Sequence, residues 1–310
     1  MPFDNVISRT DAGALIPEEA SNDILKLIPK ESAALTLFRR MTMSRKQKRL
    51  PVLSALPTAY FVDGDTGLKQ TTEAAWSNKY LDAEEIACIC PIPEAVLEDT
   101  DYDVWGEITP LIAEAIGRTF DAAAFFGTNK PATWPTAIVP AAAAASNTET
   151  RNTTAANGGV AQDISDTFAL VETDGYDVNG AVAARKMRGL TRSARNGDGD
   201  ILPEVTADSW YGTPVQYPMR GLFPTGSGSV EAIVGDFAEG ICAIRQDLAY
   251  KVLDQAALFD DEGNLIYNLP QQDMVALRVT FRGAFQVANI INHDNTNDAT
   301  RYPFATLLQS

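Results

Sequence analysis

A long predicted β-hairpin constrains the fold of this 310-residue chain more than any other feature. Its limbs cover residues 41–62 and 73–91, and the segment 63–67 between them has two glycines in a typical turn sequence. The outer part is polar, and an isolated two-stranded hairpin is only marginally stable in water. We therefore expect a neighbouring subunit to support it.

The other predicted elements form an α+β pattern without the strand–helix–strand alternation that produces a parallel sheet. Apolar residues at helical spacing predict the longest helix over 103–126, and Pro110 inside it predicts a kink. Shorter helices are predicted at 17–28, 32–39, 163–172 and 180–195, and strands near Val215 and at 230–234, 241–245, 249–253 and 275–287.

Composition excludes several classes of protein. Hydrophobic residues make up 45% of the chain and charged residues 21%, a globular balance. No apolar run approaches the roughly 20 residues that span a bilayer, and the start lacks the basic and apolar regions of a secretory signal. The formal net charge of −16 disfavours sequence-specific binding to DNA.

A cationic segment interrupts this acidic background. Its charged residues are Arg39, Arg40, Arg45, Lys46, Lys48 and Arg49. One interpretation is a solvated arm, and the other is contact with acidic neighbours or with nucleic acid. The sequence leaves both open, and we take Arg39, Arg40, Arg45 and Lys48 as candidate inter-subunit contacts.

Five further candidate contacts lie on the hairpin, namely Tyr60, Asp63, Asp65, Lys69 and Trp76. The two aspartates flank a glycine, which favours a tight turn over a cation site. Lys69 could form an isopeptide bond with an asparagine of another subunit only if its amine were desolvated and deprotonated. A solvated lysine is the simpler interpretation, and we predict no such bond.

The chain lacks the motifs of common catalytic and metal sites. There is no GxSxG, P-loop, HExxH or GxGxxG motif, and His293 is the only histidine. Residues 196–200 resemble the start of a calcium loop, but its sixth and twelfth positions would be Ile201 and Ala207. Cys88 and Cys90 are expected to be buried strand residues. We predict no catalytic, metal or cofactor site and no enzymatic activity.

Five motifs in this order resemble the major capsid proteins of tailed bacteriophages of the Hong Kong 97 type, over about residues 15–305. They are Leu15-Ile16-Pro17-Glu18-Glu19 with residues 24–37; Leu50-Pro51-Val52-Leu53 leading to Tyr60-Phe61-Val62 and the glycine turn; Ile92-Pro93-Glu94-Ala95-Val96-Leu97-Glu98-Asp99 before the helix that ends Phe120-Asp121-Ala122-Ala123-Ala124-Phe125-Phe126-Gly127; Gly235-Asp236-Phe237; and Gln272-Asp273-Met274-Val275-Ala276-Leu277-Arg278-Val279.

The resemblance implies an α+β phage-capsid fold with five parts. These are an N-terminal arm (1–45), an extended β-hairpin loop with its strands (46–92), a peripheral domain with the spine helix 103–126 (93–175), an axial domain (176–268), and a return strand of the peripheral domain with the C-terminus (269–310). The core pattern begins by about residue 15, whereas the founding member of the family carries a long scaffolding segment that a protease removes. A separate scaffolding protein, or a mature chain, is therefore expected.

The resemblance also implies a structural virion protein, made in the cytoplasm of a bacterial host and without membrane contact. Hexamers and pentamers would close into an icosahedral shell around double-stranded phage DNA, with no sequence-specific binding. Its partners would include a portal, and a decoration protein is left open. The alternative is an encapsulin-type nanocompartment, which has the same fold and packages an enzyme.

Overall fold

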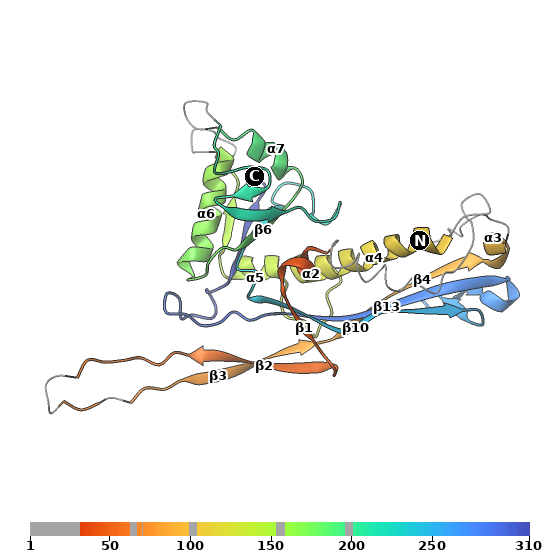
Figure 1. Ribbon diagram of the computed structural model, residues 1–310, viewed down its shortest axis with the longest axis horizontal. Helices are drawn as coiled ribbons and strands as arrows, with labels where there is room; N and C mark the ends of the chain where they lie inside the picture. Colours follow the sequence, from red (N-terminus) through yellow and green to blue (C-terminus); the bar gives the residue numbers. More distant parts are fainter. Residues whose placement is uncertain (1–31, 63–66, 70, 99–103, 153–158, 196–200) are drawn as a thin grey trace.

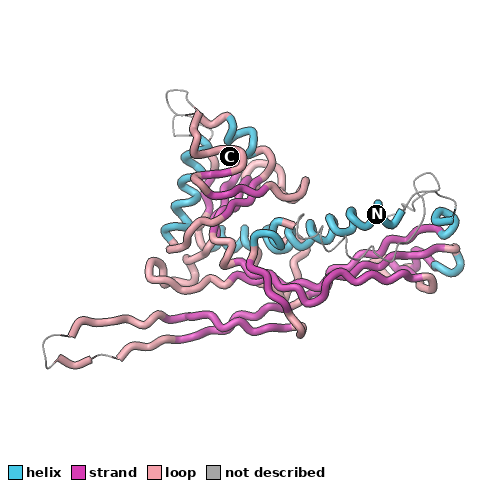
Figure 2. Tube along the Cα trace, viewed as in Figure 1, coloured by secondary structure: helices cyan, strands magenta, loops and turns pink. Residues whose placement is uncertain are grey.

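The computed structural model describes residues 32–62, 67–69, 71–98, 104–152, 159–195 and 201–310. A long sheet with a helix along it adjoins a compact second sheet, and a hairpin projects from the region where they meet (Figures 1 and 2). The helix predicted at 17–28, the candidate contacts Asp63 and Asp65, and the predicted turn at 196–200 lie outside the described residues.

The long sheet has the strand order β1-β10-β13-β4, in which β1 is parallel to β10 and the other pairs are antiparallel. Its strands are β1 (Arg39–Thr42), β10 (Gly240–Leu253), β13 (Met274–Val287) and β4 (Glu84–Pro93). The alternation predicted for β13 is confirmed, because Val279 and Phe281 are buried and Arg278 is exposed. One face of the sheet is therefore apolar and must be covered.

Helix α4 (Val104–Asp121) covers that face and confirms the long predicted helix (Figure 1). Ile112, Ile116 and Phe120 are buried at helical spacing. The Phe120 ring meets Phe281 of β13 edge-on, with 6.3 Å between the ring centroids. Aromatic packing thus fixes the helix against the centre of the sheet.

The hydrogen-bond pattern of this helix changes at its C-terminal end. The α-helix is continuous through Pro110, and a π-helical turn, η1 (Ala122–Phe126), follows Asp121. Gly127 then adopts φ 78°, a left-handed conformation that costs glycine little, and its N–H donates to the carbonyl of Ala123. The helix end is thereby set at a defined residue.

The short helix α2 (Ala33–Leu37) joins the N-terminal segment to this helix end. The Asp121 carboxylate is buried and accepts hydrogen bonds from the Ser32 hydroxyl at 2.6 Å and from the N–H groups of Ala33 at 2.9 Å and Ala34 at 3.0 Å. The first backbone N–H groups of a helix need such acceptors. Asp121 therefore ties the start of α2 to the end of α4.

The compact sheet has the order β5-β14-β9-β6-β8-β7. Its strands are β5 (Thr148–Thr150), β14 (Phe304–Leu308), β9 (Val230–Gly235), β6 (Gly180–Ala183), β8 (Thr213–Gln216) and β7 (Ser209–Trp210), and its helices are α5 (Ile138–Ala144), α6 (Gly159–Thr173) and α7 (Met187–Arg192). Buried Glu231 of the central strand β9 pairs with Arg151 at 2.7 Å and Lys186 at 2.8 Å. The strands predicted near Val215 and at 230–234 are confirmed, as is the helix at 163–172.

The single helix predicted at 180–195 is wrong. Residues Gly180–Ala183 form the buried strand β6 between β9 and β8, and only Met187–Arg192 are helical. Three of the four residues are Gly or Ala, which have little strand preference of their own, so the pairing with two neighbouring strands decides the conformation.

Sheet membership also crosses the predicted domain boundaries. Strand β10 falls within the segment 176–268 that was assigned to the axial domain, yet it pairs with β1 and β13 of the long sheet. Strand β14 falls within 269–310, yet it pairs with β9 and β5 of the compact sheet. Each sheet is therefore built from segments that are far apart in the sequence.

The end of the long sheet distant from the compact sheet carries four short elements. They are α3 (Glu94–Glu98), β11 (Ala257–Phe259), β12 (Leu265–Asn268) and the 3-10 turn η3 (Leu269–Gln271). Leu269, Met274 and Ala276 form a small buried cluster there. We call this region, residues 94–98 and 254–273, the distal end.

Candidate interaction surfaces

The stem of the projecting hairpin has an inner and an outer face. It consists of β2 (Gln47–Ala55) and β3 (Ala75–Asp82), paired antiparallel. On the inner face, Val52 and Leu81 are buried. The Lys79 ammonium donates to the carbonyl of Val287 at 3.1 Å. This face holds the stem against the body of the subunit.

The outer face carries aromatic residues that are exposed. Trp76 lies opposite Leu53, and Tyr80 lies opposite Arg49. Their side chains are 69% and 45% exposed, respectively. Large aromatic side chains without cover are uncommon on a monomer and are enriched where proteins meet.

The part of the hairpin beyond the stem extends away from both sheets (Figure 1). Tyr60, Phe61, Val62 and Leu68 are exposed there, and so is Lys69. The candidate contacts Tyr60, Lys69 and Trp76 are therefore all accessible on one projecting element. The absence of an isopeptide bond at Lys69 stays a prediction.

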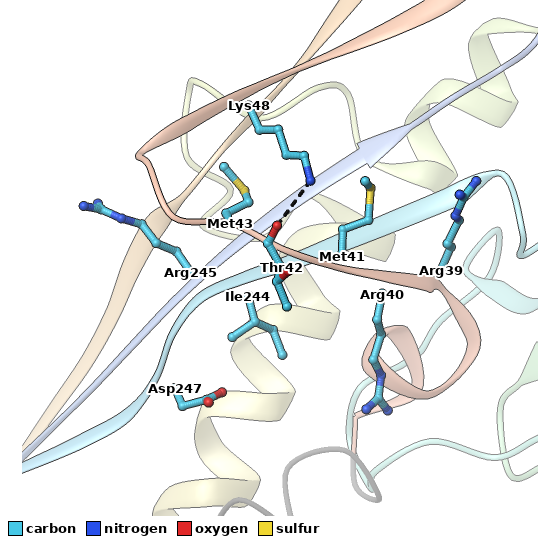
Figure 3. A pocket seen from close by; sticks show the side chains of 9 residues that line it. All are labelled: Arg39, Arg40, Met41, Thr42, Met43, Lys48, Ile244, Arg245 and Asp247. Atoms are coloured by element: carbon cyan, nitrogen blue, oxygen red, sulfur yellow. Dashed lines mark hydrogen bonds between the residues drawn. The ribbon is translucent and has the colours of Figure 1, made fainter.

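A basic cavity lies at the base of the hairpin, where β1 and β10 separate. Pairing of the two strands ends at Thr42 and Ile244. The cavity has a volume of about 630 Å³ and is lined by Arg39, Arg40, Met41, Thr42, Met43, Lys48, Ile244, Arg245 and Asp247 (Figure 3). We call it the basic fork.

Four cations and a single carboxylate line the basic fork. The Lys48 ammonium donates to the carbonyl of Thr42 at 3.2 Å, and the Arg40 guanidinium donates to the carbonyl of Leu35 at 2.5 Å. These bonds anchor two cations on the backbone and leave their charge unneutralised. Among the residues that the structure describes, Arg39 and Arg245 form no ion pair.

The structure brings together three of the four cationic candidates. Arg39, Arg40 and Lys48 line the basic fork, whereas Arg45 is exposed outside its lining. Sequence reasoning missed Arg245, which comes from a strand about 200 residues further along the chain. A register shift in β10 directly after Ile244 leaves this arginine exposed, and no local sequence pattern predicts that shift.

The described residues contain no group of His, Cys, Asp and Glu side chains that could hold a metal ion. Cys88 and Cys90 are half-buried in β4, and burial raises the pKa of both thiols. Burial also raises the pKa of the Cys242 thiol to about 11, so it stays protonated and unreactive. Among the helices described, none is long and apolar enough to cross a membrane.

Known proteins with a similar sequence or structure were found for nearly the whole chain. The model of a family described as "Phage capsid family" matches residues 12–290. The "Major capsid protein" of Staphylococcus phage 80alpha is 27% identical over 290 residues, which cover 92% of this chain and 86% of that protein.

Solved structures agree with these sequence matches. A chain from Microbacterium phage Oxtober96 superposes with a TM-score of 0.79 at 35% identity, covering 96% of this chain and 94% of that one. A chain from Mycobacterium phage Cain gives a TM-score of 0.80 at 30% identity, with 99% of both chains covered. The likeness therefore includes both sheets and the hairpin.

Proposed function

The chain belongs to the phage capsid family, and on that premise we propose that each copy lays its hairpin over a neighbouring copy in a closed shell. The protein is a major capsid protein of the tailed-phage type with the Hong Kong 97 fold. Its relatives are structural proteins, and they do not favour the encapsulin alternative.

The observation that carries the proposal is the exposed aromatic face of the hairpin. Trp76 and Tyr80 lie on the outer face of the stem, and Tyr60 and Phe61 lie further out without cover. Covering a large apolar side chain contributes about 1.5–3 kcal/mol. A second subunit lying against this face would supply the support that a lone two-stranded hairpin lacks.

The finer picture is also part of the proposal. Subunits form hexamers and pentamers of an icosahedral shell around double-stranded DNA, with a separate scaffolding protein and a portal. Whether a decoration protein also binds is left open. Synthesis takes place in the host cytoplasm. We assign the long sheet with α4 to the peripheral domain and the compact sheet to the axial domain. A net charge of −16 supports a shell whose inner surface does not hold DNA tightly.

Deletion of residues 58–78 tests the role of the hairpin. We expect a soluble, folded subunit that forms no shells, as seen by negative-stain microscopy and by circular dichroism. A matched variant, Ser77→Ala, changes the inner face of the stem only slightly and should assemble like the wild type.

Shells of wild-type appearance from the deleted protein would refute the role given to the hairpin. The contents of shells purified from infected cells provide a separate test, because a protein cargo in place of DNA would overturn the phage function.

A further inference from the structure

We propose that copies of this protein dock head to tail, with the acidic distal end of one copy in the basic fork of another. The inference rests on the proposed function, since it requires that the chain assembles with itself. It specifies a second contact, which lies at the base of the hairpin and is ionic in character.

The positive charge of the chain is concentrated around the basic fork. Residues 39–49 contain six lysines and arginines, and residues 32–62 contain no acidic residue, in a chain of net charge −16. Folding adds Arg245 from β10 to this cluster. Lys46 pairs with Glu84 at 3.6 Å, and Asp247 is the one carboxylate in the lining, so an excess of positive charge remains at the basic fork.

The distal end has the opposite composition. The segments 94–98 and 254–273 that form it contain two and five acidic residues, respectively, and no lysine or arginine. Strand pairing brings the stretches together, because Pro93 lies opposite Met274 in the long sheet. Sequence segments that are far apart thus form one acidic end.

The acidic side chains of the distal end are available for contact. Glu94 and Glu98 of α3 are exposed, and so are Asp261 and Glu262 in the turn between β11 and β12. Asp260 has a different role, since its carboxylate accepts hydrogen bonds from the backbone N–H groups of Glu262 at 3.0 Å and Asn264 at 2.7 Å. These hydrogen bonds fix the shape of the turn and leave the side chains of Asp261 and Glu262 exposed.

The two charged regions of one subunit cannot meet each other. Strand β10 leads away from the basic fork toward the distal end, and the nine residue-to-residue steps from Ile244 to Leu253 span roughly 30 Å. Ionic attraction between exposed groups falls off over a Debye length of about 8 Å at physiological ionic strength. Neither region can therefore neutralise the other within one subunit, whereas a second copy of the chain offers each region a partner of opposite charge.

A contact between two different patches suits a closed assembly. Such a heterologous interface generates a ring when its rotation closes, whereas identical patches give only pairs. Complementary charges also steer the encounter and fix its register. The opposite charges at the two ends of this subunit thus fix the orientation of the contact, which the exposed aromatic side chains of the hairpin do not.

Charge reversal on the full-length protein tests the docking. The fork variant is Arg39→Glu with Arg245→Glu, and the distal variant is Asp261→Lys with Glu262→Lys. At about 50 mM NaCl we expect each variant to assemble roughly tenfold more slowly than the wild type by light scattering. The protein carrying all four substitutions should regain most of the wild-type rate.

The control variant, Arg192→Glu with Arg220→Glu, makes the same change in charge at exposed positions away from the basic fork and the distal end. It should assemble at nearly the wild-type rate. If the protein with all four substitutions does not regain the wild-type assembly rate, or if the control variant is slowed as much as the fork variant, the docking is overturned. If wild-type and variant proteins all assemble alike, only this inference fails; if the wild type forms no shell, the proposed function fails.

Two further measurements use the wild-type shell and DNA. Carbodiimide couples lysines to adjacent carboxylates, so mass spectrometry should find Lys48 joined to Asp261, Glu262, Glu94 or Glu98 of another copy; coupling of Lys48 to other regions alone would contradict the docking. The second measurement is binding of a duplex DNA fragment. If the wild type binds it and the fork variant does not, and the protein with all four substitutions does not regain assembly, the basic fork binds nucleic acid instead.

Discussion

At the scale of single residues, Asp121 has the most unusual environment in the described part of the chain. Its carboxylate is fully buried and has hydrogen-bond donors around it, but the nearest contacts include no cation. Burial raises the pKa of Asp121 to about 6, and the hydrogen bonds from Ser32, Ala34 and Ala33 oppose this rise only in part. Folding therefore favours the protonated acid.

The raised pKa of Asp121 predicts how stability depends on pH. Its contribution is fully present below the unfolded pKa of 3.8 and is lost as the pH rises through about 6. We expect the free energy of unfolding of the wild type, relative to Asp121→Asn, to be about 1 kcal/mol greater at about pH 5 than at about pH 7. Urea denaturation of unassembled subunits at both pH values measures this, and a difference independent of pH would contradict it.

At the scale of elements, Phe38 joins the two sheets. Its ring lies 5.6 Å from Phe285 of β13 and 6.4 Å from Phe304 of β14, measured between centroids, and it also contacts Phe125 of η1 at 5.5 Å. Aromatic pairs at these separations stabilise beyond the area that they bury. One side chain thus couples the long sheet, the compact sheet and the end of the spine helix.

We expect Phe38→Ala to reduce the free energy of unfolding by about 3–5 kcal/mol, because it leaves a cavity where three elements meet. The matched control is Phe259→Ala on β11, where the side chain is 60% exposed and the change should stay within about 0.5 kcal/mol. Urea denaturation of unassembled subunits measures both. Equal effects at the two positions would show that Phe38 does not join the sheets.

Local sequence patterns predict correctly those elements whose apolar residues recur with a single strong period. The alternation in β13 and the helical spacing in α4 each report burial against a single neighbour, and both are confirmed. Strand β6 was mistaken for helix because its residues, Gly180–Ala183, are small and depend on β8 and β9 for their conformation. Arg245 of the basic fork was missed because its partners are brought near only by the pairing of β1 with β10.

At the scale of the whole molecule, two electrostatic effects oppose each other during assembly. Subunits with a net charge of −16 repel one another, and salt screens that repulsion. Salt also screens the attraction between the basic fork and the distal end. Added salt therefore speeds assembly of the wild type by weakening the repulsion and slows it by weakening the attraction. The apolar contacts of the hairpin respond little to such screening.

These opposing effects predict different salt dependences for the wild type and the fork variant. Arg39→Glu with Arg245→Glu removes the attraction and increases the repulsion, so between about 50 and 500 mM NaCl its assembly rate should rise more steeply than that of the wild type. The two rates should converge at the upper end, where the Debye length approaches about 4 Å and the hairpin contact dominates. Light scattering at a series of salt concentrations measures this convergence. Parallel salt dependences would mean that the basic fork takes no part in the contact between subunits, and assembly would then rest on the hairpin alone.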